Sequence, residues 1–336
     1  MLKVGVIGCG YWGPNLVRNF GEQDDAAVEY VSDLRKERLD FIQKRYPAVK
    51  VTPDYREVLK DKTVAAVAIA TPVSTHFQIA QEALKQKKHV LLEKPMTATQ
   101  DQAKRLIELA RKNKRTLMVG HTFLYTGAVR KIKQILDSGQ LGKLYYFDSV
   151  RINLGMFQHD TNVIWDLAVH DFSIMDFLIG LEPLSISASG ACHTRHQVEN
   201  IAYITVNFKN NVIAHFYVNW LAPVKIRQIL IGGSDKMILF DDMLPSEKVK
   251  VYDKGVWFKK GGEKDKYKIQ LQYRKGDMYV PQIDITEGLY HECRHFIDCV
   301  KNNKTPLSNG IQGLRVVRLL EAAEKSIRNG SRFIKL

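Results

Sequence analysis

Apolar runs alternate with amphipathic segments of helical period along the first 123 residues of the chain. The apolar runs predict strands at 3–8, 28–33, 64–70, 89–92 and 116–120. The run at 64–70 is apolar on both faces, which is typical of a central strand in a parallel sheet. Since strands that alternate with helices build parallel sheets, we predict an α/β domain at residues 1–123.

The pattern changes after a basic helical segment at 127–138, because strands then follow one another with few helices between them. Strands are predicted at 144–153, 184–191, 201–208, 212–221, 225–232 and 236–241, and helices at 162–179, 284–302 and 311–328. Lys209-Asn210-Asn211 has the composition of a hairpin turn. These elements predict a C-terminal α+β domain, residues 124–336, with an open-faced and mostly antiparallel sheet.

The length of 336 residues also favours two domains over one. A one-sided sheet of the predicted size has an apolar face that needs cover, because monomers rarely expose large apolar patches. We therefore expect a homo-oligomer, either a homodimer or a homotetramer, formed through the C-terminal sheet.

Composition narrows the class of protein. No apolar run approaches the roughly 20 residues that cross a bilayer, and the first strand begins at once, so we expect a cytoplasmic protein with no membrane partner. Four cysteines without a CxxC pair suit a reducing compartment. The net charge of +14 is spread along the chain, without a nucleic-acid-binding signature. It serves either to attract an anionic cofactor or substrate or only to keep the protein soluble.

The first 13 residues hold the most informative local motif, since the first apolar run breaks into Gly8-x-Gly10-x-x-Gly13 before a helical segment. The first glycine allows a tight strand-to-helix turn, the second lets the backbone approach a pyrophosphate, and the third lets helix pack closely on strand. The N-terminal end of the following helix attracts phosphate. The motif therefore predicts a Rossmann dinucleotide-binding domain.

Asp33 ends the second predicted strand at the distance, about 20 residues, where an acid binds the adenosine ribose. Its carboxylate would accept hydrogen bonds from the ribose hydroxyls and repel a 2′-phosphate, which favours NAD. Arg35 leaves NADP open, because this side chain either faces a 2′-phosphate or is simply solvated.

Two further motifs carry residues suited to chemistry. Glu93-Lys94-Pro95 follows the strand 89–92, at the sheet edge where parallel sheets bind ligands. Asp166 and His170 are spaced i, i+4 and so project from one face of a predicted helix. His170 suits a base that takes a hydroxyl proton while hydride leaves for a nicotinamide. Lys94 would stabilise the resulting alkoxide, and Asp166 would orient the substrate or the imidazole.

These motifs together resemble the glucose-fructose oxidoreductase, inositol dehydrogenase and rhizopine-catabolism (Gfo/Idh/MocA) family of NAD(P)-dependent oxidoreductases, over essentially the whole chain. The matching pieces are Gly8 to Gly13, Ala70-Thr71-Pro72 with His76, Glu93-Lys94-Pro95, Asp166 with His170, and Gly232 to Lys236. The resemblance implies a catalytic set of Lys94, Asp166 and His170. It also implies cofactor contacts from Gly8, Gly10, Tyr11, Trp12, Gly13, Asp33, Arg35, Thr71, Pro72, His76, Glu93 and Lys94.

The same resemblance implies an oxidoreductase that acts on a CH–OH group of a sugar, with a nucleotide-linked or acidic sugar as one option. Substrate contacts are expected from Lys94, His121, Arg151, Asn153, Gln158, Asp166 and His170. The chain departs from the family pattern in two places. Ala168 stands where a glycine is frequent, and the segment after Gly120 lacks the usual Arg and Pro.

Two alternatives remain at this point. The chain is either an enzyme or a non-catalytic NAD(P)-binding regulator or sensor, because fold does not fix function. His291-Glu292-Cys293-Arg294-His295 also matches the HExxH pattern of zinc proteases. Helical geometry places both histidines opposite the apolar face of their helix, so we expect solvated side chains and no metal.

Overall fold

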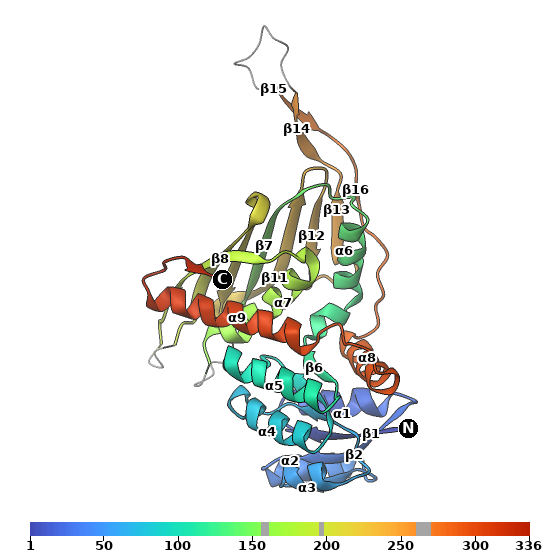
Figure 1. The fold of residues 1–336 in the computed structure, drawn as a ribbon. Helices are drawn as coiled ribbons and strands as arrows, with labels where there is room; N and C mark the ends of the chain where they lie inside the picture. The colour runs from blue at the N-terminus through green and yellow to red at the C-terminus, as the bar shows by residue number, and fades with distance from the viewer. Residues whose placement is uncertain (156–160, 195–197, 260–269) are drawn as a thin grey trace. The chain divides into compact units, whose positions relative to one another are not determined.

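The computed structural model describes residues 1–155, 161–194, 198–259 and 270–336. The chain forms two compact units (Figure 1). The first contains residues 1–126 and 285–321, and the second contains residues 127–284 and 322–336. The predicted second domain held all of residues 124–336. The chain instead returns to the first unit for residues 285–321.

The first unit contains a six-stranded parallel sheet of order β3-β2-β1-β4-β5-β6. Its strands are β1 (Leu2–Ile7), β2 (Ala26–Ser32), β3 (Lys50–Thr52), β4 (Ala66–Ile69), β5 (His89–Glu93) and β6 (Leu117–Gly120). Its helical segments are α1 (Gly13–Gly21), α2 (Lys36–Arg45), α3 (Tyr55–Lys60), α4 (Val73–Lys85), α5 (Gln100–Lys112), the 3₁₀ turn η1 (Thr122–Tyr125) and α8 (Gly288–Asn302). The predicted parallel α/β architecture is confirmed, and β3 is the one strand of this sheet that the pattern did not predict.

Burial explains why these strands form. All four residues of β4 are fully buried, as the apolar run at 64–70 predicts for the centre of a parallel sheet. Helix α8 joins this unit through apolar contacts with α1, where the Phe20 and Phe296 rings lie 6.2 Å apart. Periodicity predicts this helix but not the unit to which it belongs, because the packing partner is far away in sequence.

The second unit contains a nine-stranded mixed sheet of order β16-β13-β12-β11-β7-β10-β9-β8-β17. Its strands are β7 (Leu144–Leu154), β8 (Pro183–Ala191), β9 (Ile201–Phe208), β10 (Ile213–Asn219), β11 (Leu221–Gly233), β12 (Met237–Asp241), β13 (Val249–Tyr252), β16 (Met278–Tyr279) and β17 (Ile334–Lys335). The β7–β10 pair is parallel and the other pairs are antiparallel. The expected open-faced, mostly antiparallel sheet is therefore confirmed.

Helices α6 (Gly127–Asp137) and α7 (Val169–Ile179) lie on one face of this sheet (Figure 1). Phe172 of α7 packs edge-on against Phe216 of β10, with ring centroids 4.8 Å apart. The predicted helix at 162–179 begins as a π-helical segment, Ile164–Ala168, before α7. The predicted turn at residues 209–211 is present, and Asn210 and Asn211 both adopt positive φ, as such turns require.

Beyond the main sheet, β14 (Gly255–Lys259) and β15 (Gln270–Arg274) pair as a separate two-stranded ribbon, and α9 (Gly310–Arg328) runs near the end of the chain. Within the described ranges, no helix combines the length and the apolar character that crossing a membrane requires.

Candidate active site

The glycine turn after β1 has the geometry that the motif predicts. Gly8 has φ +93°, and a Cβ there would lie 2.7 Å from the carbonyl carbon of Ala70. A Cβ on Gly13 would lie 2.2 Å from the Gly8 carbonyl oxygen, so only glycine lets α1 start this close to β1. The nearest atom to a Cβ on Gly10 is Nη2 of Arg35, at 3.5 Å. The first and third glycines are therefore sterically required, and the second keeps the backbone approachable.

The first turn of α1 has no side chain of its own to satisfy its amides. Trp12 occupies the N-cap without a side-chain hydrogen bond, Pro14 follows in the first turn, and no acidic residue lies there. Orphan amides and the helix dipole at such an end attract an anion. This end of the sheet fits the pyrophosphate of a dinucleotide, which in a Rossmann domain binds at this turn.

Asp33 lies directly after β2 and beside the glycine turn. Its Oδ2 accepts a hydrogen bond from the Cys9 amide at 2.7 Å, and its carboxylate pairs with the half-exposed guanidinium of Arg35. Burial alone raises the pKa of Asp33, but the hydrogen bonds from Arg35 and Cys9 outweigh it and keep the pKa below its usual value. The carboxylate is thus ionised at neutral pH and suited to accept ribose hydroxyls.

The loops after β4 and β5 are joined by His76. One ring nitrogen lies 2.8 Å from the carbonyl oxygen of Thr71 and the other lies 2.9 Å from that of Pro95. His76 is buried, and burial lowers its pKa against the opposing effect of these carbonyls. Because both ring nitrogens lie within hydrogen-bond distance of backbone carbonyls, His76 connects the loop after β4 to the loop after β5. The direct cofactor contact expected from His76 stays a prediction.

Lys94 begins the loop after β5, next to a buried polar cluster made of Glu93, His121 and Glu292. The Lys94–Pro95 peptide bond is cis. Glu93 lies opposite Gly120 in the β5–β6 register, and a Cβ on Gly120 would come within 2.8 Å of Oε1 of Glu93. The glycine therefore makes room for the carboxyl group.

His121 is buried, and neither of its ring nitrogens has a hydrogen-bond partner among the described residues. Burial, reinforced by the charge of Lys94, lowers the pKa of His121 to about 3. The imidazole is therefore neutral at any pH at which the protein works. Burial places His121 beneath the surface of the first unit, so the predicted substrate contact from this residue remains a proposal.

Glu292 of α8 completes this cluster and was not predicted as a site residue. It is fully buried, and Thr122 donates a hydrogen bond of 2.7 Å to its Oε2. Burial raises the pKa of Glu292 well above its usual value, and the negative charge of Glu93 raises it further. Oε1 of Glu93 and Oε1 of Glu292 both lack a hydrogen-bond partner among the described residues.

We expect Glu292→Gln to stabilise the protein at alkaline pH. Because the folded-state pKa of Glu292 is raised, its stability contribution is present below the unfolded pKa of about 4.3 and is lost as pH rises. Gln resembles the protonated acid but does not ionise, so the variant does not lose this stability as pH rises. The free energy of unfolding at pH 8 should rise by about 1–3 kcal/mol relative to the unmodified chain, with little difference at pH 4, where the unfolded glutamate is itself mostly protonated.

Urea unfolding at the two pH values measures this effect. The control is Glu37→Gln, which changes an exposed glutamate of α2 and should not reproduce the gain. A loss of stability at pH 8 in Glu292→Gln would contradict the account of the buried acid pair.

In the second unit, Asp166 and His170 lie on the segment where the π-helical turn passes into α7. Both side chains are partly exposed. Nε1 of the fully buried Trp220 donates a hydrogen bond of 3.0 Å to Oδ2 of Asp166. Trp220 is itself packed against Gly155, where a Cβ would lie 2.3 Å from the indole. Asp166 therefore has a fixed orientation, and π-helical turns of this kind are frequent at functional sites.

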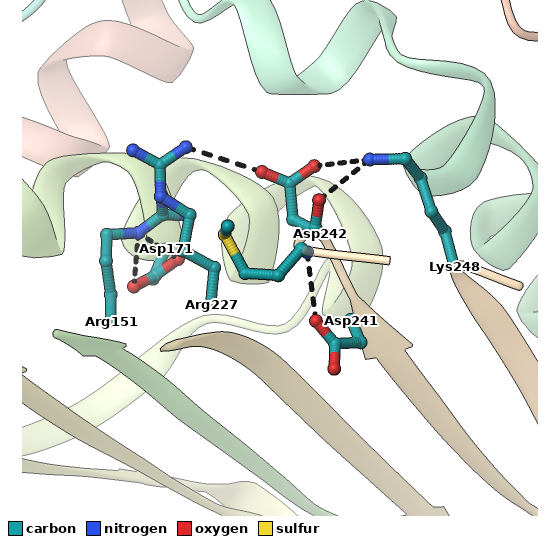
Figure 2. Close-up of polar contacts among 7 residues, drawn as sticks. Arg151, Asp171, Arg227, Asp241, Asp242 and Lys248 are labelled. Carbon is teal, nitrogen blue, oxygen red and sulfur yellow. Dashed lines mark hydrogen bonds and ion pairs between the residues drawn. The ribbon is translucent and has the colours of Figure 1, made fainter. Parts of the chain in front are cut away.

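Arg151 does not have the surroundings expected for a substrate ligand. Its side chain is 3% exposed, and its guanidinium donates to both oxygens of Asp171 at 2.7–3.0 Å (Figure 2). The buried guanidinium is held by Asp171 of α7, and the predicted substrate contact from Arg151 stays a prediction. Asn153 is partly exposed on the same strand, and Gln158 lies outside the described residues.

The HExxH segment does not have the arrangement of a metalloprotease site. Its Glu292 lies in the core against Thr122, whereas His295 accepts a hydrogen bond from the Leu307 amide at 3.0 Å. His295 is therefore engaged with backbone, not simply solvated as predicted. Within the described part of the chain, no group of three His, Cys, Asp or Glu side chains lies close enough to hold a metal ion.

Comparisons with known proteins agree with this geometry. Residues 2–121 match the family model for the GFO/IDH/MocA oxidoreductases, NAD-binding Rossmann fold, and residues 129–239 match the GFO/IDH/MocA C-terminal domain. The chain is 25% identical to myo-inositol 2-dehydrogenase of Thermotoga maritima, over 100% of this chain and 98% of that protein. It is also 25% identical to UDP-N-acetylglucosamine 3-dehydrogenase of Acidithiobacillus ferrooxidans, over 94% of each.

Among solved structures, the fold is similar to that of GenD2 from gentamicin A biosynthesis in complex with NAD. The TM-score is 0.84 at 21% identity, covering 100% of this chain and 96% of that one. An oxidoreductase structure from Magnetospirillum magnetotacticum gives a TM-score of 0.82 at 26% identity, covering 96% of this chain and 99% of that one. Both similarities cover nearly the whole chain, and so include both units.

Proposed function

Because the chain belongs to the GFO/IDH/MocA family of oxidoreductases with an NAD-binding Rossmann domain, we propose that it moves hydride between NAD and a secondary alcohol or ketone of a sugar-like substrate. The observation that carries this proposal is the joint presence of the steric glycine turn and of Asp166 and His170 on the π-to-α turn. The distant relatives that act on inositols and on a UDP-sugar support a CH–OH group as the reacting centre.

Each proposed residue has one task in the reaction. When bound, a nicotinamide ring supplies the hydride acceptor or donor. His170 takes the proton of the substrate hydroxyl during oxidation, since a neutral imidazole is a competent base near pH 7. Lys94 hydrogen-bonds the same oxygen and stabilises its alkoxide character. Asp166, held by Trp220, orients the substrate or the imidazole.

The surroundings of Arg151 bear on the choice of substrate class. The guanidinium of Arg151 is already paired with the buried carboxylate of Asp171, so it does not favour the acidic-sugar option. We therefore propose a neutral cyclic polyol or a nucleotide-linked sugar, as in the inositol and UDP-N-acetylglucosamine dehydrogenases. Incubation of the protein with NAD and myo-inositol, scyllo-inositol or UDP-N-acetylglucosamine, followed by NADH absorbance, tests this choice. NADH formation from uronic acids alone would contradict it.

We expect the protein to bind NADH at least about tenfold more tightly than NADPH, which corresponds to about 1.4 kcal/mol. The ionised Asp33 would accept the ribose hydroxyls of NADH and repel the 2′-phosphate of NADPH. Calorimetric titration with each nucleotide, after denatured protein has been checked for carried-through cofactor, measures the difference. Tighter NADPH binding would show that Arg35 leaves Asp33 to pair with the phosphate.

We also propose that the protein is a homodimer or homotetramer formed through the nine-stranded sheet. On the face opposite α6 and α7, the rings of Tyr203 and Tyr217 stack 4.6 Å apart, and Tyr203 is 55% exposed. Stacked aromatic side chains of this kind are enriched in the centres of interfaces. Light scattering from the purified protein measures the state, and a monomer at micromolar concentration would refute the proposal.

A further inference from the structure

The ion pair between Arg151 and Asp171 joins strand β7 to the first turn of α7. Arg151 Nε lies 3.0 Å from both carboxylate oxygens of Asp171, and Nη2 lies 2.7 Å from Oδ1. Both side chains are almost completely buried, at 3% and 2% exposure. Asp171 directly follows His170 in the sequence, so the pair holds the backbone next to the proposed base.

A second ion pair, between Arg227 of the neighbouring strand β11 and Asp242, provides a comparison for the Arg151–Asp171 pair. Arg227 of β11 lies opposite Arg151 in the β7–β11 register, and it pairs with Asp242 at 3.4 Å (Figure 2). Asp242 also pairs with Lys248 at 3.1 Å. The Arg227 pair is partly exposed and connects only parts of the sheet, whereas the Arg151 pair reaches the helix that carries His170.

The π-helical turn before α7 is fixed at its own end, because Oδ1 of Asn162 accepts hydrogen bonds from the amides of Ile164 and Trp165 and Trp220 donates to Asp166. At the start of α7 itself, Ala168 makes no side-chain hydrogen bond, and the Arg151–Asp171 pair links the first turn to strand β7. A planar guanidinium that forks onto a carboxylate fixes both the height and the rotation of the helix, which apolar packing alone does less strictly. A rotation of α7 by about 10° would move the tip of His170 by about 1 Å, enough to cost a reaction up to about 100-fold.

Resting on the proposed function of His170, we propose that Arg151 is a positioning residue whose ion pair with Asp171 sets the orientation of the catalytic imidazole. Arg151 acts on the rate through the helix and makes no contact with the reacting atoms. The role is one of geometry, so it predicts a loss in kcat with little change in KM.

The test replaces both partners together, as Arg151→Met with Asp171→Leu, because removing one alone leaves a buried charge unpaired. We expect this double variant to fold and to lose kcat by about 10- to 100-fold, with KM within about threefold of the unmodified enzyme. Arg227→Met is the matched control, since Asp242 keeps Lys248 as a partner, and its kcat should stay within about twofold. Arg151→Lys, which keeps the charge but loses the fork, should lose less kcat than the double variant.

Two kinetic outcomes overturn the proposal. A folded double variant with unchanged kcat would show that the pair does not position His170. A raised KM with unchanged kcat would return Arg151 to the substrate contacts.

A readout without turnover separates this inference from the proposed function. In protein labelled with ¹⁵N-histidine, and with the His170 signal assigned by its loss in His170→Ala, the backbone amide order parameter should fall from the rigid value of about 0.85 in the double variant. Arg227→Met should leave it unchanged. An unchanged order parameter in the double variant overturns the positioning role. A lowered order parameter in a protein that turns over no substrate supports the positioning role and refutes the proposed function.

Discussion

Replacing His170 with Ala is expected to lower kcat by about 100- to 10,000-fold, because the substrate hydroxyl would lose the proposed base that takes its proton. The NADH dissociation constant should stay within about threefold of the unmodified value, since His170 belongs to α7 and the glycine turn belongs to the other unit. Steady-state kinetics and NADH fluorescence titration measure the two quantities on the same preparation.

His291→Ala is the matched control for this substitution. It removes a partly exposed helical histidine from α8 and should change kcat by less than about twofold. If His170→Ala kept full activity, the protein would use another base and the assignment of α7 would be wrong. If both variants lost activity equally, the effect would be on folding and not on proton transfer.

Gly13→Ala is expected to reduce NADH affinity by at least about 100-fold, which corresponds to about 2.7 kcal/mol. The added Cβ would lie 2.2 Å from the Gly8 carbonyl oxygen, a distance that forces α1 and the glycine turn apart. The amides at the start of α1 would then no longer lie where the pyrophosphate binds. Overpacking of this kind also costs about 1–3 kcal/mol of folding stability.

Gly21→Ala provides the control within the same helix. A Cβ on Gly21 meets nothing within 4 Å, so Ala should leave NADH affinity unchanged and raise stability by up to about 1 kcal/mol. Fluorescence titration and thermal unfolding of both variants check the contrast. Equal NADH affinity in Gly13→Ala and the unmodified chain would remove the glycine turn from the cofactor site.

Local patterns in the sequence were sufficient for every strand of the first sheet except β3. The glycine spacing and the apolar run at 64–70 depend on short-range geometry, so the turn and the central strand are found where they were predicted. The return of residues 285–321 to this unit depends on packing against α1, and helical periodicity does not identify a distant partner.

Two buried charged residues carry signals of their burial in the sequence. Arg151 shares the side of its strand with Phe147, and alternation therefore places it on the buried face, where an arginine needs a counter-ion. Glu292 lies three residues after Leu289 and four before Phe296, which puts it on the apolar face of its helix. Both positions predict a paired or protonated group.

The sequence does not identify the side chains that these residues contact. Asp171 and Arg151 are 20 residues apart, and Trp220 and Asp166 are 54 apart. These contacts exist only because β7, β10 and α7 pack together. Neither charge nor periodicity along the chain specifies which carboxylate or which indole a given residue will contact, so the surroundings of the proposed catalytic residues required the three-dimensional structure.

Deuterium transfer from substrate to nicotinamide tests the proposed hydride transfer itself. The protein is incubated with NAD and myo-inositol, scyllo-inositol or UDP-N-acetylglucosamine, each deuterated at its CH–OH carbons, and the nicotinamide is analysed by mass spectrometry. Deuterium from one substrate carbon should appear on the reduced nicotinamide, and this transfer should be lost in His170→Ala. NADH binding without deuterium transfer from any of these substrates would contradict a dehydrogenase and favour an NAD-binding regulator.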